Sequence, residues 1–157
     1  MFDRRRICIA LGAVGATLMT GHAFAQADLP KVVVSKDPNC GCCGAWAEHM
    51  KRAGFKVEVV TTTQLEAVKA RLGVPDGLSS CHTAEVSGYV IEGHVPPDAV
   101  KRLLAEKPKA LGLAVPGMPM GSPGMEAAGA EPETYEVVLF GASGQSTFAR
   151  YRGMKLV

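Results

Sequence analysis

Asp37-Pro38-Asn39-Cys40-Gly41-Cys42-Cys43-Gly44-Ala45-Trp46 places three of the five cysteines of this 157-residue chain within one short turn. An apolar run, Val32–Val34, precedes the turn, and an amphipathic segment, Trp46–Ala53, follows it. This order is typical of a strand, a tight loop and a helix, with the thiols at the first turn of the helix. We therefore expect the rest of the domain to be organised around this turn.

The chain beyond the turn predicts an α/β fold. Apolar spacing and helix-stopping glycines indicate the order βαβα and then ββα, which is the order of a thioredoxin-like domain. The predicted elements are strands at 31–35 and 55–61, helices at 41–53 and 64–72, a hairpin over 84–92, and a helix at 98–106. An extra C-terminal hairpin is predicted from 135–140 and 146–151. The intervening stretch, 107–132, is rich in Gly, Pro and Met and is predicted to be a functional loop.

The first 25 residues have the features of a signal peptide. Arg4–Arg6 precede an uncharged run, Ile7–Ala25, which ends in the cleavage pattern Ala23-Phe24-Ala25. We expect cleavage after Ala25 and export to the periplasm, by the general or the twin-arginine route, leaving residues 26–157 as one domain. An uncleaved membrane anchor is the alternative, since the run is long enough to span a bilayer.

Charge excludes some classes of partner. Removing Asp3 and Arg4–Arg6 from the 15 acidic and 17 basic residues leaves fourteen of each. A neutral chain without a basic patch does not fit a nucleic-acid-binding protein or one attracted to anionic lipid. After signal cleavage, we expect no membrane span.

The cysteine turn favours thiolate chemistry. Cys40 and Cys43 form a Cys-x-x-Cys pair, and Cys42 adds a third sulfur beside them. The dipole and free N–H groups at a helix N-terminus lower the pKa values of thiols there. Redox exchange and metal binding both need thiolate, so Cys40 and Cys43 are candidate catalytic residues and all three cysteines are candidate metal ligands.

A fourth sulfur, Cys81, precedes the predicted hairpin in Ser80-Cys81-His82. In a thioredoxin-like order, the residues before the third strand pack against the Cys-x-x-Cys turn. Cys81, and with it His82, is therefore expected to face the first three sulfurs. Two alternatives remain: Cys81 is a buried small apolar residue, or the four cysteines that follow the signal peptide form two structural disulfides.

The donor set favours copper over zinc. Zinc usually takes tetrahedral ligands from two separated loops, whereas Cu(I) accepts two or three thiolates together with thioether and imidazole. The candidate ligands beyond the cysteine turn are Cys81, His82, His94, Met118 and Met120. Methionine is also a common core filler, and His82 could point away from the thiols. His49 is predicted to lie on a solvated helix face.

Several separated motifs together resemble one family. They are Cys40-Gly41-Cys42-Cys43 with Trp46, Cys81-His82-Thr83-Ala84, Gly88-Tyr89, Glu92-Gly93-His94-Val95-Pro96, Gly112-Leu113-Ala114-Val115-Pro116-Gly117-Met118-Pro119 and Gly121-Ser122-Pro123-Gly124-Met125. This combination resembles the periplasmic metal-binding proteins that include copper-resistance CopG, many of them long described only as a domain of unknown function. The resemblance spans nearly all of residues 26–157.

The resemblance implies a thioredoxin-like domain whose Cys-x-Cys-Cys turn binds copper as Cu(I), as single ions or as a small cluster. It matches Cys40, Cys42 and Cys43 to the family's site motif, and Cys81 and His94 to recurring positions. The leading hypothesis is a periplasmic copper-binding protein that interconverts Cu(I) and Cu(II), which would make it a copper oxidoreductase. The alternatives are a thiol–disulfide oxidoreductase and a passive metallochaperone that hands copper to a membrane exporter or another periplasmic protein.

Overall fold

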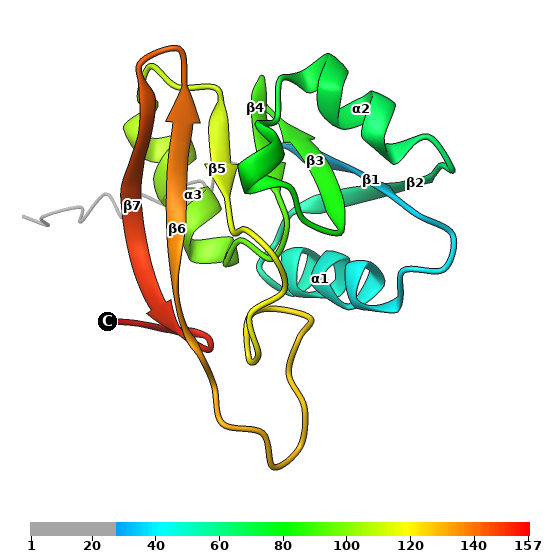
Figure 1. The fold of residues 1–157 in the computed structure, drawn as a ribbon, viewed down its shortest axis with the longest axis vertical. Coiled ribbons are helices and arrows are strands. Elements are labelled where there is room, and N and C mark those ends of the chain that lie inside the picture. Colours follow the sequence, from blue (N-terminus) through cyan, green and yellow to red (C-terminus); the bar gives the residue numbers. More distant parts are fainter. Residues whose placement is uncertain (1–27) are drawn as a thin grey trace, which may run out of the picture.

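The computed structural model describes residues 28–157, so the predicted signal peptide lies outside the described residues. In that range the chain forms a mixed α/β domain with one eight-stranded sheet and three α-helices (Figure 1). The strands are β1 (Lys31–Lys36), β2 (Lys56–Thr61), β3 (His82–Val86), β4 (Tyr89–Glu92), β5 (Gly112–Ala114), β6 (Thr134–Gly141), β7 (Gly144–Arg152) and β8 (Lys155–Leu156). The helices are α1 (Gly41–Arg52), α2 (Leu65–Leu72) and α3 (Pro97–Glu106), with a 3-10 turn, η1, at Asp76–Leu78.

The sheet order is β2-β1-β3-β4-β5-β6-β7-β8. The pairs β1–β2 and β4–β5 are parallel, and the other neighbouring pairs are antiparallel. The predicted parallel pair, the hairpin turning at Ser87–Gly88 and the C-terminal hairpin are all present. The left-handed Gly73, with φ of 73°, ends α2 as expected.

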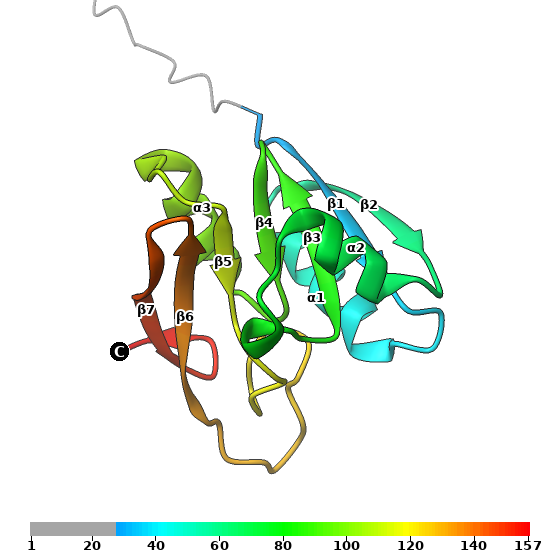
Figure 2. The ribbon, with the colours of Figure 1, turned by 45° about the horizontal axis from the view of Figure 1, so that its top comes forward.

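Two short strands were not expected from the sequence. The segment predicted as a loop contains β5, which pairs with β4 on one side and β6 on the other. As a result, the C-terminal hairpin continues the main sheet (Figure 2). β5 has three residues, too few to show the alternation of apolar and polar residues from which a strand is predicted. It forms because the backbones of β4 and β6, on either side, supply its hydrogen-bonding partners. The two-residue β8 is similarly short.

Helices cover both faces of the sheet. The larger core lies under α1 and α3, where Trp46 and Met50 meet Val100, Leu103 and the inward side chains of the strands. A smaller cluster lies on the other face and contains Val74, Leu78, Val90, Ala114 and Phe140. The same face holds Lys69, the one buried residue of α2.

Several connecting segments meet at one end of the sheet. The turn into α1 follows β1, Cys81 directly precedes β3, and Glu92 ends β4. Because β3 is antiparallel to β1 and β4, its beginning lies beside their ends. This topology gathers the cysteine turn, Cys81 and the segment after β4 at one place.

The junction of β4 with β5 depends on Gly112. A Cβ atom at this position would lie 1.8 Å from the carbonyl oxygen of Val90. We expect Gly112→Ala to lower the free energy of unfolding by about 1–3 kcal/mol, because backbone must move to admit the methyl group. Urea denaturation monitored by circular dichroism measures this change.

Gly77→Ala is the matched control, since no atom lies within 4 Å of a Cβ there. We expect that control to change the free energy of unfolding by less than about 0.5 kcal/mol. Equal stability of the Gly112→Ala protein and the wild type would show that the close β4–β5 contact is not a constraint in solution.

Candidate metal centre

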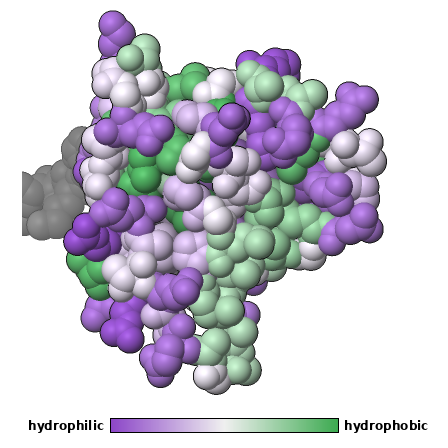
Figure 3. Space-filling model, in the orientation of Figure 1, coloured by the Kyte–Doolittle hydropathy of each residue, from purple (hydrophilic) through white to green (hydrophobic). Residues whose placement is uncertain are grey.

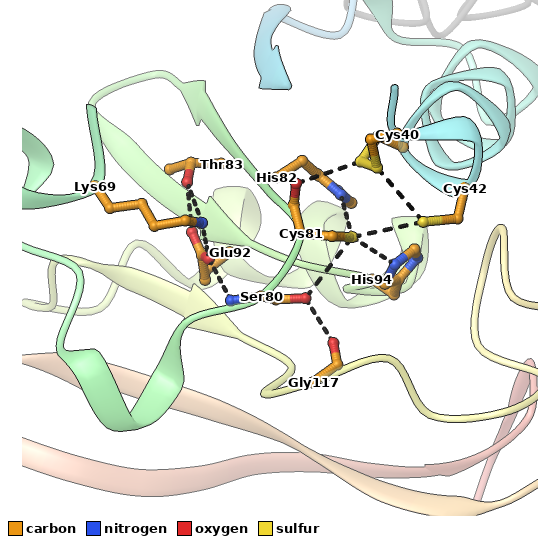
Figure 4. A network of polar contacts seen from close by, with 11 residues as sticks. Cys40, Cys42, Lys69, Ser80, Cys81, His82, Thr83, Glu92, His94 and Gly117 are labelled. Carbon is orange, nitrogen blue, oxygen red and sulfur yellow. Dashed lines mark hydrogen bonds and ion pairs between the residues drawn. A yellow bond between two sulfur atoms is a disulfide. The ribbon is translucent and has the colours of Figure 1, made fainter. Parts of the chain in front are cut away.

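Four sulfur atoms meet where α1 begins (Figure 4). The ligand atoms of Cys40, Cys42, Cys43 and Cys81 all lie within 4.8 Å of one another. Cys40 and Cys43 are joined by a disulfide, and Cys42 and Cys81 are free. The Cys42 sulfur lies 3.5 Å from that of Cys40 and 3.7 Å from that of Cys81. The four atoms therefore suit both a shared soft metal and exchange between thiol and disulfide.

The turn is placed by the start of α1 and by Trp46. The N–H groups of Asn39 and Cys40 bond to the side chain and the carbonyl of Asp37, and these bonds close the loop before the helix. Trp46 is fully buried, and its indole N–H donates to the carbonyl of Val95 at 2.9 Å. That bond ties α1 to the segment after β4.

Two imidazoles extend the sulfur cluster. The Cys81 sulfur lies 3.0 Å from Nε2 of His94 and 3.4 Å from Nδ1 of His82. The ligand atoms of these three residues also lie within 4.8 Å of one another, so Cys81 belongs to both groups. Both histidines are fully buried. The structure therefore places both nitrogen and sulfur donors within reach of the Cys81 sulfur.

The tautomer of His94 follows from its second contact. Its Nδ1 lies 2.8 Å from the carbonyl oxygen of Pro123, which can only accept, so Nδ1 carries the proton. Nε2 then presents a lone pair toward Cys81. Burial lowers the pKa of His94, although the bond to Pro123 and the nearby Glu126 carboxylate oppose that shift. His94 is a neutral imidazole oriented as a ligand.

His82 is less completely satisfied. Its ring lies 4.5 Å from that of Trp46 and meets His94 edge-on at 5.1 Å, measured between centroids. Burial, with His94 and Lys69 nearby, holds the pKa of His82 well below its usual value. Nε2 of His82 is a buried polar atom without a hydrogen-bond partner among the described residues.

The thiol of Cys81 is held in its protonated form. Burial, followed by the neighbouring Cys42, raises the pKa of Cys81 to about 12. Since Nε2 of His94 is an acceptor, the S–H group of Cys81 is the donor between them. Although the Cys81 sulfur lies near the start of α1, burial outweighs any lowering of its pKa by the helix dipole.

The predicted methionines lie in a loop that adjoins the centre. Met118 is 53% exposed, and Met120 lines a cavity of about 550 Å³ together with Glu126 and Met154. The structure thus gathers the four cysteines and two histidines, while Met118 and Met120 lie toward the surface. Figure 3 shows a mildly apolar area over α1 and this loop.

Three contacts fasten the loop to the centre. Ser80 Oγ donates to the carbonyl of Gly117 at 2.5 Å, and His94 bonds to Pro123. At Gly124, a Cβ atom would lie 2.8 Å from the Cys42 carbonyl oxygen, so only glycine allows this approach.

One further contact, between the loop and α1, was not expected from the sequence. His49 was predicted to be solvated, but its Nε2 lies 2.5 Å from Glu126 and its side chain is only 18% exposed. Sequence spacing cannot reveal a pair whose members come from a helix and a distant loop.

Known proteins match both the centre and the whole fold. A family described as a protein of unknown function, DUF411, matches residues 78–125, which contain Cys81, both buried histidines and the loop methionines. No curated protein matches the chain. Within the described residues, no helix combines the length and the apolar character needed to cross a bilayer.

Two solved structures, described as copper resistance protein CopG Form 1 and Form 2, match with a TM-score of 0.74 and 44% sequence identity. The first match covers 80% of this chain and 99% of the other, and the second covers 78% and 98%. At that identity over nearly the full length of the relatives, the chain belongs to the family of copper resistance protein CopG.

Proposed function

We propose that this chain is a periplasmic copper-binding protein that serves in copper resistance. The observation that carries the proposal is the gathering of three cysteine sulfurs and two neutral imidazoles around the sulfur of Cys81. Cu(I) prefers a donor set of thiolate sulfur and imidazole nitrogen. The two matching solved structures are named for copper resistance. Export by the predicted signal peptide would place the centre in the periplasm.

Copper in this proposal is cargo, bound as Cu(I) by Cys40, Cys42, Cys43, Cys81 and His94 and held singly or as a small cluster. His82 is a further candidate ligand through Nδ1. Because Cys81 belongs to both ligand groups, its sulfur is suited to bridge two ions. Met118 and Met120 are proposed thioether ligands in the adjoining loop, and a membrane exporter or another periplasmic copper protein is the proposed recipient.

The proposed redox step uses Cys40 and Cys43. Reduction of their disulfide to two thiols takes up two electrons, and two protons from solvent. Two Cu(I) ions supply the two electrons when they become Cu(II); until the disulfide is reduced, the ligands for these ions are Cys42, Cys81 and the two histidines. The reverse step returns the electrons to copper and reforms the disulfide. Copper interconversion and thiol chemistry therefore balance within one centre.

Three features of the fold support a thioredoxin-like assignment. They are the Cys-x-x-Cys turn after β1, the parallel pairing of β1 with β2, and the antiparallel pairing of β3 with both β1 and β4.

The thiol–disulfide oxidoreductase is the second candidate, and the Cys40–Cys43 disulfide beside the free Cys42 favours it. In this alternative, Cys42 or Cys81 resolves the mixed disulfide. Insulin reduction by dithiothreitol separates the two functions. Strong turnover that survives Cys42→Ser and is indifferent to copper would favour the oxidoreductase, and turnover no faster than the uncatalysed reaction would favour copper handling.

Removal of the turn thiols tests copper binding directly. We expect the reduced mature protein, titrated anaerobically with Cu(I) against a competing chelator, to bind copper through the turn. The Cys40→Ser/Cys42→Ser/Cys43→Ser protein should lose most of the bound copper, because one cysteine and two histidines remain. Metal analysis after desalting gives the stoichiometry. Ser143→Ala, in the exposed β6–β7 turn, is the control; equal copper in the triple variant and wild type would disprove the proposed site.

The raised pKa of Cys81 predicts a distinctive pH dependence. In the metal-free protein with the Cys40–Cys43 disulfide intact, we expect iodoacetamide to modify Cys81 at least tenfold more slowly at pH 8 than in urea-unfolded protein. Since the pKa lies at about 12, the thiolate fraction and the rate should keep rising past pH 9, where an ordinary thiol levels off. Peptide mass spectrometry follows the modification. A plateau near pH 9 would show that Cys81 is an ordinary thiol.

A further inference from the structure

A buried ion pair lies beneath α2, on the face of the sheet opposite α1. Lys69 is 3% exposed and Glu92 is fully buried. The Lys69 ammonium pairs with Oε1 of Glu92 and donates to the hydroxyl of Thr83 at 3.0 Å. Thr83 stands opposite Glu92 in the β3–β4 register and donates to Oε2 at 2.6 Å. None of these three residues is a candidate metal ligand.

The Glu92 carboxylate has one further partner, and that partner leads to the metal centre. The backbone N–H of Ser80 donates to Oε1 of Glu92 at 2.7 Å (Figure 4). Ser80 immediately precedes Cys81, and its hydroxyl donates to the carbonyl of Gly117 at the start of the methionine loop. One carboxylate therefore anchors the loop that carries Cys81, and through Ser80 it also anchors the loop that carries Met118.

The fit around Ser80 is close. A Cβ atom at Gly93, which follows Glu92, would lie 2.5 Å from the Ser80 hydroxyl and 2.6 Å from the Val115 carbonyl oxygen. Ser80 is thus held between the Glu92 carboxylate and the backbone of Gly93. His94 follows Gly93. The same short segment therefore carries both His94, which faces Cys81, and Glu92, whose carboxylate binds the residue before Cys81.

Stability alone gives little reason for such a pair. Two charges lose their hydration on burial, and well-packed apolar residues of similar volume often replace a buried ion pair without loss of stability. What an apolar replacement cannot supply is the acceptor for the Ser80 N–H group. The distinctive contribution of the pair is therefore the position of that backbone.

We propose that Glu92, held in place by Lys69 and Thr83, is a positioning residue of the metal centre. It fixes the backbone at Ser80 so that the Cys81 sulfur lies within reach of both Cys42 and His94. The consequence for copper rests on the proposed function, whereas the consequence for the Cys81 sulfur does not. Without the carboxylate oxygen, the Ser80 N–H group turns to solvent and the loop carries Cys81 away.

Two neutral double variants isolate the acceptor. Lys69→Met with Glu92→Gln removes both charges and keeps an amide oxygen for Ser80, whereas Lys69→Met with Glu92→Leu removes the oxygen as well. Both should fold, because neither leaves a buried charge unpaired. The control is Arg71→Met with Glu85→Gln, which removes an exposed ion pair between the same helix and the neighbouring strand β3.

The first measurement needs no metal. In a Cys40→Ser/Cys43→Ser background, the bifunctional reagent dibromobimane fluoresces when it links the Cys42 and Cys81 thiols. We expect the Leu variant to cross-link about tenfold more slowly than the Gln variant and the control, in line with the tenfold or larger effects of residues that orient metal ligands. Denaturant unfolding midpoints, measured alongside, show whether stability accounts for the difference.

The second measurement is Cu(I) affinity with all four cysteines present, obtained by competition with a chelator. The Leu variant should bind about tenfold more weakly than the Gln variant. Equal cross-linking by the Leu and Gln variants would overturn the proposal, and so would slow cross-linking that follows the unfolding midpoint in both. If cross-linking is slow in the Leu variant alone, but the wild-type protein does not bind Cu(I), the positioning role is supported and the copper function is refuted.

A milder substitution covers the case in which the Leu variant does not fold. Thr83→Val keeps the ion pair and removes the hydroxyl that orients the carboxylate. We expect its cross-linking rate to fall by about two- to threefold, and Thr147→Val, at a surface hydroxyl that donates to Glu136, is the control. An unchanged rate would contradict a role of the oriented carboxylate, and a lowered rate would support it.

Discussion

Strand β3 runs antiparallel to β1, with His82 opposite Lys36, and the candidate metal centre depends on that register. The pairing places Cys81 beside the turn that leaves β1, where the sulfur of Cys42 is 3.7 Å away. A shift of one residue would reverse the face on which each β3 side chain lies. The core prevents this shift, because Ala84 and Val86 are buried against α1 and α3 on the same face as His82.

The centre combines soft donors with a low-dielectric surrounding. The two histidines are held neutral by burial, and the carbonyl of Pro123 directs the lone pair of His94 toward Cys81. Burial also keeps Cys81 protonated, so a metal that binds there must displace a proton. Burial makes a free thiolate unfavourable and keeps the imidazoles neutral and able to coordinate. The site therefore favours a metal cation, whose positive charge compensates the negative charge of the thiolate.

The two faces of the sheet have different tasks. On the face covered by α1, Trp46 packs on His82 and bonds to Val95, so the helix start is tied to the segment after β4. On the face covered by α2, Lys69, Thr83 and Glu92 hold Ser80. The loop between β5 and β6 joins the two sets through Ser80 and His94, and His49 on α1 adds the contact to Glu126. Ligand geometry is thus shared among four segments that are distant in sequence.

Local sequence signals were enough to predict the order of the main elements and to single out the candidate donors. Helix-stopping glycines, alternating valines and the Cys-x-Cys-Cys turn are local signals, and they predicted α1, β1, β2 and both hairpins within a few residues. Local signals could not predict β5, which owes its existence to strands on both sides, or the inward side chain of Lys69, whose partner Glu92 comes from another element. The approach of Cys81 to the turn sulfurs was expected from the predicted strand order, but only the fold shows that Met118 lies toward solvent. Residue types follow from the chain, but distances between segments follow from strand register and burial, which no short window of sequence contains.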